Sequence, residues 1–176
     1  GDRYEQTPWA TADRGTLLAE SVTIQYSGLD STGLLELAAA GGGGHLEARG
    51  TAGSDTIEYQ GGRLTHAGRA PVALAGIASL DIRSLAGTAQ ITVTPDGVTI
   101  YVDGGSPQPG DQLLVNGGPD GEAIFVGSDR VQVGTAPALV YASISELRVS
   151  PAGGEDQVTA ADLRGSGLER VEIDLG

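Results

Sequence analysis

Acidic and basic side chains alternate with aliphatic ones in several short runs, which places them on one face of a β-strand. The candidates are Glu36, Asp81, Arg83, Glu146 and Arg148. Carboxylates can cleave glycans by acid–base chemistry. Carboxylates with nearby arginines can also bind glycans. Their alternation with core residues such as Leu80 and Leu147 is, however, typical of a solvated sheet face. The sequence therefore favours a protein that is not an enzyme, with a carbohydrate-binding or carbohydrate-cleaving protein as the alternative.

Other catalytic signals are weak. His45 and His66 are the two histidines, and each lies in or beside a predicted strand, where a structural role is more typical than that of a base or ligand. No nucleophile elbow, phosphate loop, dinucleotide fingerprint or zinc-protease motif occurs. Tyrosines could stack on sugars, but Tyr26 and Tyr141 hold a repeat position that Leu74 takes in another copy, which indicates packing.

A repeat organises the elements that carry these side chains. Leu-x-apolar triplets begin at Leu35, Leu80 and Leu147, and their spacings are close to two and three times a unit of about 22 positions. Steps of that size connect a series of aliphatic positions: Leu35, Ile57, Leu80, Val102, Ile124, Leu147 and Val171. Such a period predicts a parallel β-helix (β-solenoid) of about seven or eight coils, in which Ile57 to Val171 form one vertical stack.

Short runs rich in Val, Ile and Thr between glycine-rich turns predict many strands and no long helix. The expected strands are 22–26, 35–37, 46–48, 56–59, 63–66, 72–75, 80–82, 91–93, 98–102, 112–115, 123–126, 130–133, 138–141, 146–149, 157–160 and 168–175. A β-sandwich is the alternative fold, and the period favours the solenoid. Residues 1–20 lack the repeat and are predicted to form a lead-in segment or N-terminal cap, with the solenoid spanning 21–176.

Composition limits the partners. The 176 residues carry a formal net charge of −13, and all ten basic residues are arginine, so nucleic acid is not expected as a partner. No apolar run approaches the eighteen or so residues that span a bilayer, so membrane insertion is not expected either. Cysteine is absent, which excludes disulfides and thiolate metal sites within this sequence. The chain begins at Gly1, and we expect it to be processed or part of a longer protein.

The segment 102–163 carries three motifs in a fixed order: VDGGSPQPGDQLLVNG, then GEAIFV, then YASISELRV. It resembles the Gly/Asp-rich repeats of very large bacterial secreted and surface proteins, whose corresponding motifs follow in this order. The resemblance implies a β-solenoid segment of an adhesin-like, sheath or surface-layer protein, located outside the cell or on its surface. It implies no catalytic activity.

The resemblance extends to calcium-binding β-rolls, in which glycines form turns and aspartates chelate Ca²⁺. The nearest matches are residues 117–124 and 153–158, with Asp120, Glu122, Glu155 and Asp156 as metal candidates. Neither match fits the nine-residue repeat, and the two lie far apart in the sequence. Turn glycines with solvated acids are therefore the favoured interpretation, and no cofactor is expected, with calcium as the alternative.

An alternating strand is predicted at the C-terminal end of the solenoid. Its apolar positions Leu168, Val171, Ile173 and Leu175 are expected to form an assembly edge. Unpaired strand edges recruit further strands, so we expect this edge to associate with another coil of the same protein or with a neighbouring copy, giving a rod or filament.

Overall fold

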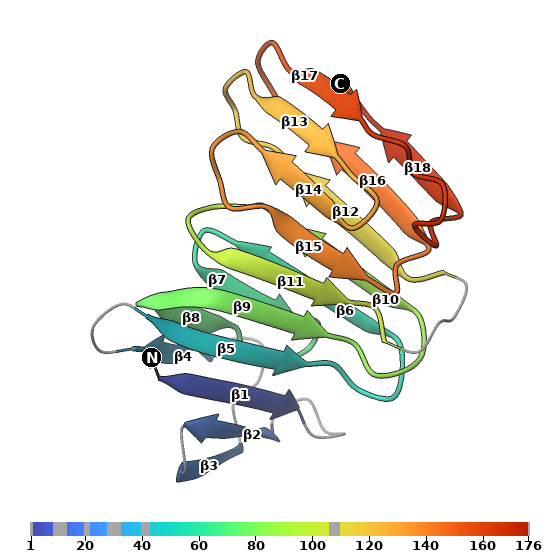
Figure 1. Cartoon of the computed structure of the whole chain (residues 1–176). Helices are drawn as coiled ribbons and strands as arrows, with labels where there is room; N and C mark the ends of the chain where they lie inside the picture. Colours follow the sequence, from blue (N-terminus) through green and yellow to red (C-terminus); the bar gives the residue numbers. More distant parts are fainter. Residues whose placement is uncertain are drawn as a thin grey trace.

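The computed structural model describes residues 2–8, 14–19, 22–27, 33–39, 43–105 and 110–175. Within these ranges the chain forms strands, turns and loops and no helix, so the all-β prediction is confirmed. No segment of this described part is a helix able to span a membrane. The strands form two mixed sheets, sheet A and sheet B, and the chain passes repeatedly from one to the other (Figure 1).

Sheet A has ten strands. In sheet order they are β17 (Gln157–Ala160), β13 (Ala123–Val126), β14 (Arg130–Val133), β15 (Leu139–Ala142), β11 (Thr99–Asp103), β9 (Ile77–Arg83), β5 (Gly44–Arg49), β1 (Arg3–Pro8), β2 (Arg14–Ala19) and β3 (Val22–Ser27). Sheet B has eight strands. Their order is β18 (Arg170–Ile173), β16 (Glu146–Ser150), β12 (Gln112–Asn116), β10 (Ala89–Val93), β6 (Asp55–Gln60), β7 (Arg63–His66), β8 (Val72–Ala75) and β4 (Leu35–Ala38).

Two kinds of pairing build the sheets. Strands that follow one another in successive passes through the same sheet pair in parallel, as β10 does with β12 and β9 with β11. Three antiparallel meanders interrupt this pattern: β1–β2–β3 and β13–β14–β15 in sheet A, and β6–β7–β8 in sheet B. A meander adds two strands to its sheet and leaves the chain running in its original direction.

Inward-facing aliphatic side chains form columns across the strands, because alternate residues of a strand point to the same face. One column of sheet B contains Ile57, Ile91, Leu113, Leu147 and Val171. A column of sheet A contains Leu46, Leu80 and Ile100, which are at most 2% exposed. The core lies between these inner faces and runs along the stack.

The predicted single stack is wrong. Ile57, Leu147 and Val171 share a column of sheet B, whereas Leu80, Val102 and Ile124 belong to sheet A. In the column of sheet B, a plain pass leads from Ile91 to Leu113. The next pass, from Leu113 to Leu147, includes the meander β13–β14–β15 and is correspondingly longer. The meanders therefore break the uniform period that the sequence indicated.

The predicted strands from 22–26 to 168–175 all correspond to strands of the structure. The bounds agree for 63–66, 72–75, 123–126, 130–133 and 157–160, and the ends of the other strands are shifted. The first twenty residues contribute two further strands, β1 and β2, which the sequence did not predict. β1 pairs in parallel with β5, so residues 3–8 continue sheet A.

Candidate functional site

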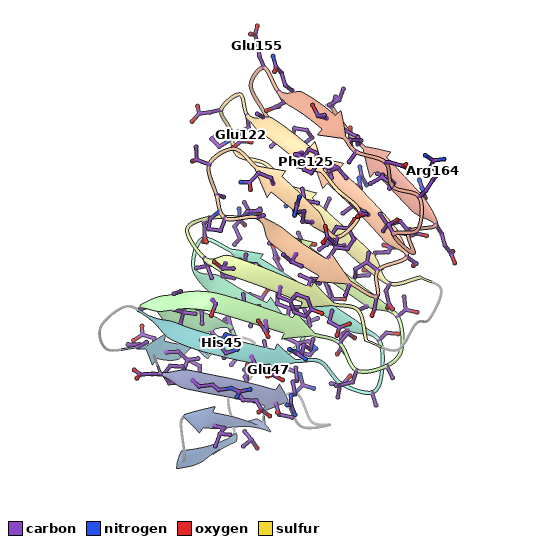
Figure 2. The ribbon with its side chains drawn as sticks, viewed as in Figure 1. His45, Glu47, Glu122, Phe125, Glu155 and Arg164 are labelled. Carbon is purple, nitrogen blue, oxygen red and sulfur yellow. The ribbon has the colours of Figure 1, made fainter. Side chains whose placement is uncertain are left out.

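The four metal candidates lie in two turns that are stacked on each other. β13 pairs in parallel with β17, which brings the turn before β13 against the turn before β17. The Glu122 carboxylate accepts hydrogen bonds from Gly118 N at 2.9 and 3.0 Å, and Asp156 Oδ1 accepts one from Glu122 N at 2.9 Å. Asp120 and Glu155 are exposed, and Figure 2 shows Glu155 at the tip of its turn. Glu122 and Asp156 thus bind backbone amides within these turns.

The five strand-face candidates are divided between the two sheets. Asp81 and Arg83 lie on β9 of sheet A, and Glu146 and Arg148 lie on β16 of sheet B. Glu36 lies on β4, at the far edge of sheet B. Their neighbours Leu80, Ile82, Leu147 and Val149 are at most 1% exposed, which confirms that the candidates alternate with core residues. The candidates therefore do not form one catalytic group.

A polar cluster covers the outer face of sheet A around β5 and β9. His45, Glu47 and Asp81 each offer a ligand atom within 4.8 Å of the other two, and they are the one such group of three in the described part of the chain. Figure 2 shows His45 and Glu47 on β5. His45 Nδ1 lies 2.8 Å from Ser79 Oγ, and His45 Nε2 lies 3.9 Å from Asp81 Oδ2.

Three arginines neutralise this cluster. Glu47 is 5% exposed, and its carboxylate lies 2.8 Å from Arg49 Nε, 3.4 Å from Arg3 Nη2 and 3.9 Å from Arg83 Nε. Burial alone raises the pKa of Glu47, but its arginine neighbours outweigh burial and hold the pKa below its ordinary value. Arg83 also donates to Asp81 at 3.1 Å. A cation bound here would have to compete with guanidinium groups already paired with both carboxylates, so the cluster is best described as an ion-pair network.

The remaining histidine and the buried tyrosines have structural partners. His66 Nε2 lies 2.8 Å from Asp55 Oδ1, and the Asp55 side chain is 2% exposed. Tyr59 and Tyr141 are buried, which leaves no ring face for a sugar, and burial raises the pKa of Tyr141 to about 12. Tyr101 lies on the outer face of sheet A, with the Arg83 guanidinium 5.6 Å from its ring centre. The side chain of Tyr26 lies outside the described residues.

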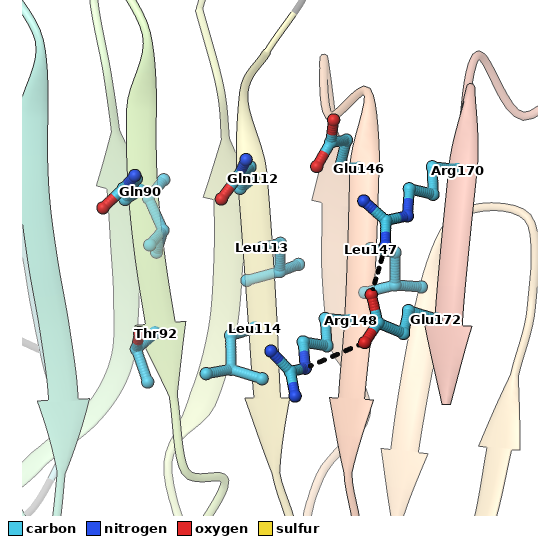
Figure 3. A pocket seen from close by; sticks show the side chains of 11 residues that line it. Gln90, Thr92, Gln112, Leu113, Leu114, Glu146, Leu147, Arg148, Arg170 and Glu172 are labelled. Atoms are coloured by element: carbon cyan, nitrogen blue, oxygen red, sulfur yellow. Dashed lines mark hydrogen bonds and ion pairs between the residues drawn. The ribbon is translucent and has the colours of Figure 1, made fainter. Parts of the chain in front are cut away.

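A shallow groove of about 290 Å³ runs across the outer face of sheet B. Gln90, Gln112, Glu146 and Arg170 form one row across β10, β12, β16 and β18 (Figure 3). The next row contains Arg148 and Glu172, whose side chains lie 3.7 Å apart. Arg170 is 2.6 Å from Glu172 within β18.

The predicted assembly edge lies at the end of sheet B. β18 pairs with β16 on one side, and no described strand pairs with its other side. β17 holds the same terminal position in sheet A. Val171 and Leu168 are half-buried against the core, whereas Ile173 is 37% and Leu175 69% exposed. The inner face is therefore less completely covered at this end than in the middle of the stack.

No family model, curated protein or solved structure matches this chain. The polar cluster of sheet A and the groove of sheet B were not recognised as sites from the sequence. Their residues come from strands that lie well apart along the chain, and the sequence offers no signal for the register that joins them.

Proposed function

We propose that this protein is a structural or adhesive module of an extracellular or cell-surface assembly, and that its C-terminal end accepts further β-strands. The observation that carries the proposal is the pair of edge strands, β17 and β18, each of which pairs in parallel with one neighbour among the described strands. Exposed edges with unpaired amides and carbonyls recruit other strands. The resemblance to repeats of bacterial surface proteins supports the location.

A parallel β-solenoid with hairpin insertions is the architecture that we propose for this module. Its support is the chain path, which crosses between two sheets and pairs in parallel at each plain pass, with a continuous core between the sheets. A non-catalytic role is supported by the separation of the carboxylate–arginine candidates onto opposite sheets and by the arginine pairing of Glu47.

A proline in β17 tests the role of the edge. Gln157 N donates to Glu122 O and Ala161 N to Val126 O, at 2.9 and 2.8 Å. Because N–H groups of a strand alternate in direction, the amide of Ala160 points to the free edge. Ala160→Pro therefore removes an edge donor without removing a hydrogen bond to β13.

We expect the 176-residue protein to self-associate with rising concentration in light scattering and negative-stain microscopy. Ala160→Pro should remain monomeric with a nearly unchanged melting temperature. Ala160→Val, which keeps the N–H, is the matched control and should associate like the parent. A parent protein that stays monomeric at every concentration would contradict the proposal.

Carbohydrate binding is a second candidate function, favoured by the groove of sheet B. Gln90 and Gln112 are exposed there beside Glu146, so amide and carboxylate groups line an open surface. Binding of neutral or acidic oligosaccharides in calorimetry, abolished by Gln112→Ala, would support it. Absence of heat with both classes of oligosaccharide would count against it.

A further inference from the structure

The C-terminal end of the stack is stepped. β15 and β16 are consecutive and pair with the consecutive strands β11 and β12, so they form one layer. Beyond this layer sheet A continues with β14, β13 and β17, whereas sheet B continues with β18 alone. Among the described strands, sheet B is therefore two strands shorter than sheet A at this end.

At the N-terminal end the two sheets have equal numbers of described strands. Below the layer of β9 and β10, sheet A continues with β5, β1, β2 and β3, and sheet B with β6, β7, β8 and β4. The two strands added to sheet A by the meander β1–β2–β3 are matched by the two added to sheet B by β6–β7–β8. The third meander, β13–β14–β15, has no counterpart among the described strands of sheet B.

We infer that the step is filled by the same end of a second copy, in a closed two-fold dimer. This inference rests on the proposed role of the C-terminal edge in assembly. In a dimer whose two-fold axis is parallel to the strands, sheet A of one copy lies in line with sheet B of the other. The longer sheet A of each copy therefore meets the shorter sheet B of its partner. β17 of each copy then extends β18 of its partner, and both steps close at once.

The direction of the strands fixes how the two edges pair. Residues 143–145 alone link β15 to β16, so the chain reverses between the sheets. β17 runs in the direction of β15, and β18 in that of β16, so β17 and β18 of one copy are antiparallel. Rotation about an axis along the strands preserves their direction. β17 therefore pairs antiparallel with the partner's β18, as β13 does with β14 within one copy.

A head-to-tail stack fits the two ends less well. It would place the even N-terminal end on the stepped C-terminal end, which leaves a gap of two strands in sheet B. The geometry therefore favours a closed dimer over an open filament.

Backbone groups of the two edges match in one register. The amide of Asp174 donates to Val149 O, so the amides of Val171 and Ile173 point away from β16, to the free edge. Those of Val158 and Ala160 point to the free edge of β17. With Ala160 opposite Val171 and Val158 opposite Ile173, both pairs can exchange two hydrogen bonds each.

Side chains are compatible in the same register. Val158 and Val171 already pack against the core of the single chain, so the pairing continues the inner apolar face and covers Ile173. On the outer face Thr159 lies opposite Glu172. β17, residues 157–160, carries no charge, so no like-charged pair forms.

Net charge opposes the dimer at long range. Two copies of −13 repel each other, and salt screens this repulsion, whereas strand pairing and apolar contacts are little affected by moderate salt. We expect the dimer dissociation constant to fall about tenfold or more between about 20 mM and 300 mM NaCl.

Because the described chain has no cysteine, engineered pairs report the arrangement directly. Thr159 and Glu172 form a non-hydrogen-bonded pair in this register, whose Cα atoms lie about 4.5 Å apart, within the range of a disulfide. Thr159→Cys with Glu172→Cys should therefore form a covalent dimer on mild oxidation. These two side chains leave opposite outer faces of one copy, so they do not form an internal bond. Each single variant should form no disulfide-linked dimer.

A head-to-tail stack would leave β18 facing the gap in sheet B, so Thr159 and Glu172 of neighbouring copies would lie apart and the same double variant would form no disulfide-linked dimer. Non-reducing gels and scattering mass separate the outcomes. A disulfide-linked species at twice 17.7 kDa supports the inference. Multimers larger than a dimer that form without this disulfide-linked species overturn it and leave the proposed assembly role intact. A parent protein that stays monomeric at high salt overturns both.

Discussion

At the scale of single residues, buried acids near the starts of strands in sheet B accept hydrogen bonds from backbone amides. Asp55 accepts hydrogen bonds from Thr51 N and Thr51 Oγ1 at 2.8 and 2.9 Å. Asp111 Oδ1 accepts one from Ala89 N at 2.8 Å, and it is 1% exposed. Asp111 O also accepts from Ser145 Oγ at 3.0 Å. These carboxylates accept hydrogen bonds from the backbone amides of Thr51 and Ala89, which explains why they are buried in so acidic a chain.

Removal of the Asp55 charge should destabilise the fold in a pH-dependent way. Burial alone raises the pKa of Asp55, but its bonds from His66 and Thr51 outweigh burial and lower the pKa. The stabilisation is therefore complete above the unfolded-state pKa of about 4 and is lost as the pH falls through the folded-state value. Asp55→Asn should lower the free energy of unfolding by about 1–3 kcal/mol at pH 7, and the difference should shrink below about pH 4.

Urea unfolding of both proteins from pH 7 to pH 2 measures this difference. Asp162→Asn is the control, because Asp162 forms an exposed pair with Arg164 and should leave the midpoint unchanged. A difference between parent and Asp55→Asn that stays constant across the pH range would contradict the explanation.

At the scale of elements, the stacked turns before β13 and β17 depend on a close approach of backbones. Gly154 has φ of 99°, and a Cβ placed there would overlap Gly121 N of the turn beneath. Gly165 has φ of 81°, but a Cβ there would meet no atom within 4 Å. The two glycines share a left-handed backbone and differ in their neighbours, so they separate conformational strain from turn packing.

Gly165→Ala should cost about 1 kcal/mol of folding free energy from backbone conformation alone. Gly154→Ala should cost about 2–4 kcal/mol, because the turn must also move away from Gly121. Urea midpoints of the two variants measure the difference. Equal losses would show that the two turns do not pack as described.

The sequence predicted elements better than their arrangement. Alternation of aliphatic residues identified strands from 22–26 onward, and β18, in the C-terminal run, is the last strand in the order of sheet B. β1 and β2 were missed because Arg3–Pro8 and Arg14–Ala19 lack the repeat. The single stack was wrong because hairpins shift the phase of the repeat. The ion-pair network around Glu47 was missed because cross-strand neighbours depend on register, which short degenerate motifs do not specify.

At the scale of the whole molecule, contacts run mainly between neighbouring strands, as expected of a stacked architecture. Side chains in the middle, such as Ile91 and Val102, are at most 1% exposed, whereas Val158 and Val171 near the C-terminal end are only half-buried. Stability should therefore be graded along the stack, with the ends opening before the middle.

Hydrogen exchange at low protein concentration measures this gradient. The amides of Thr92 and Tyr101, in strands paired on both sides, should exchange at least about a hundredfold more slowly than those of Thr159 and Glu172 in the edge strands. Exchange of all four at one rate would show that the stack opens as a single cooperative unit.

The parallel ladder described for β16 and β18 has a mechanical consequence. Figure 1 places β18 at one end of the stack and β1 near the other, so a pull between these strands acts across the strands and not along them. Such a load acts along the hydrogen bonds between strands. It breaks the bonds of one strand after another and does not shear all the bonds between two strands at once. Under tension the module would yield by releasing chain from its ends, and would behave as an extensible tether instead of a rigid rod.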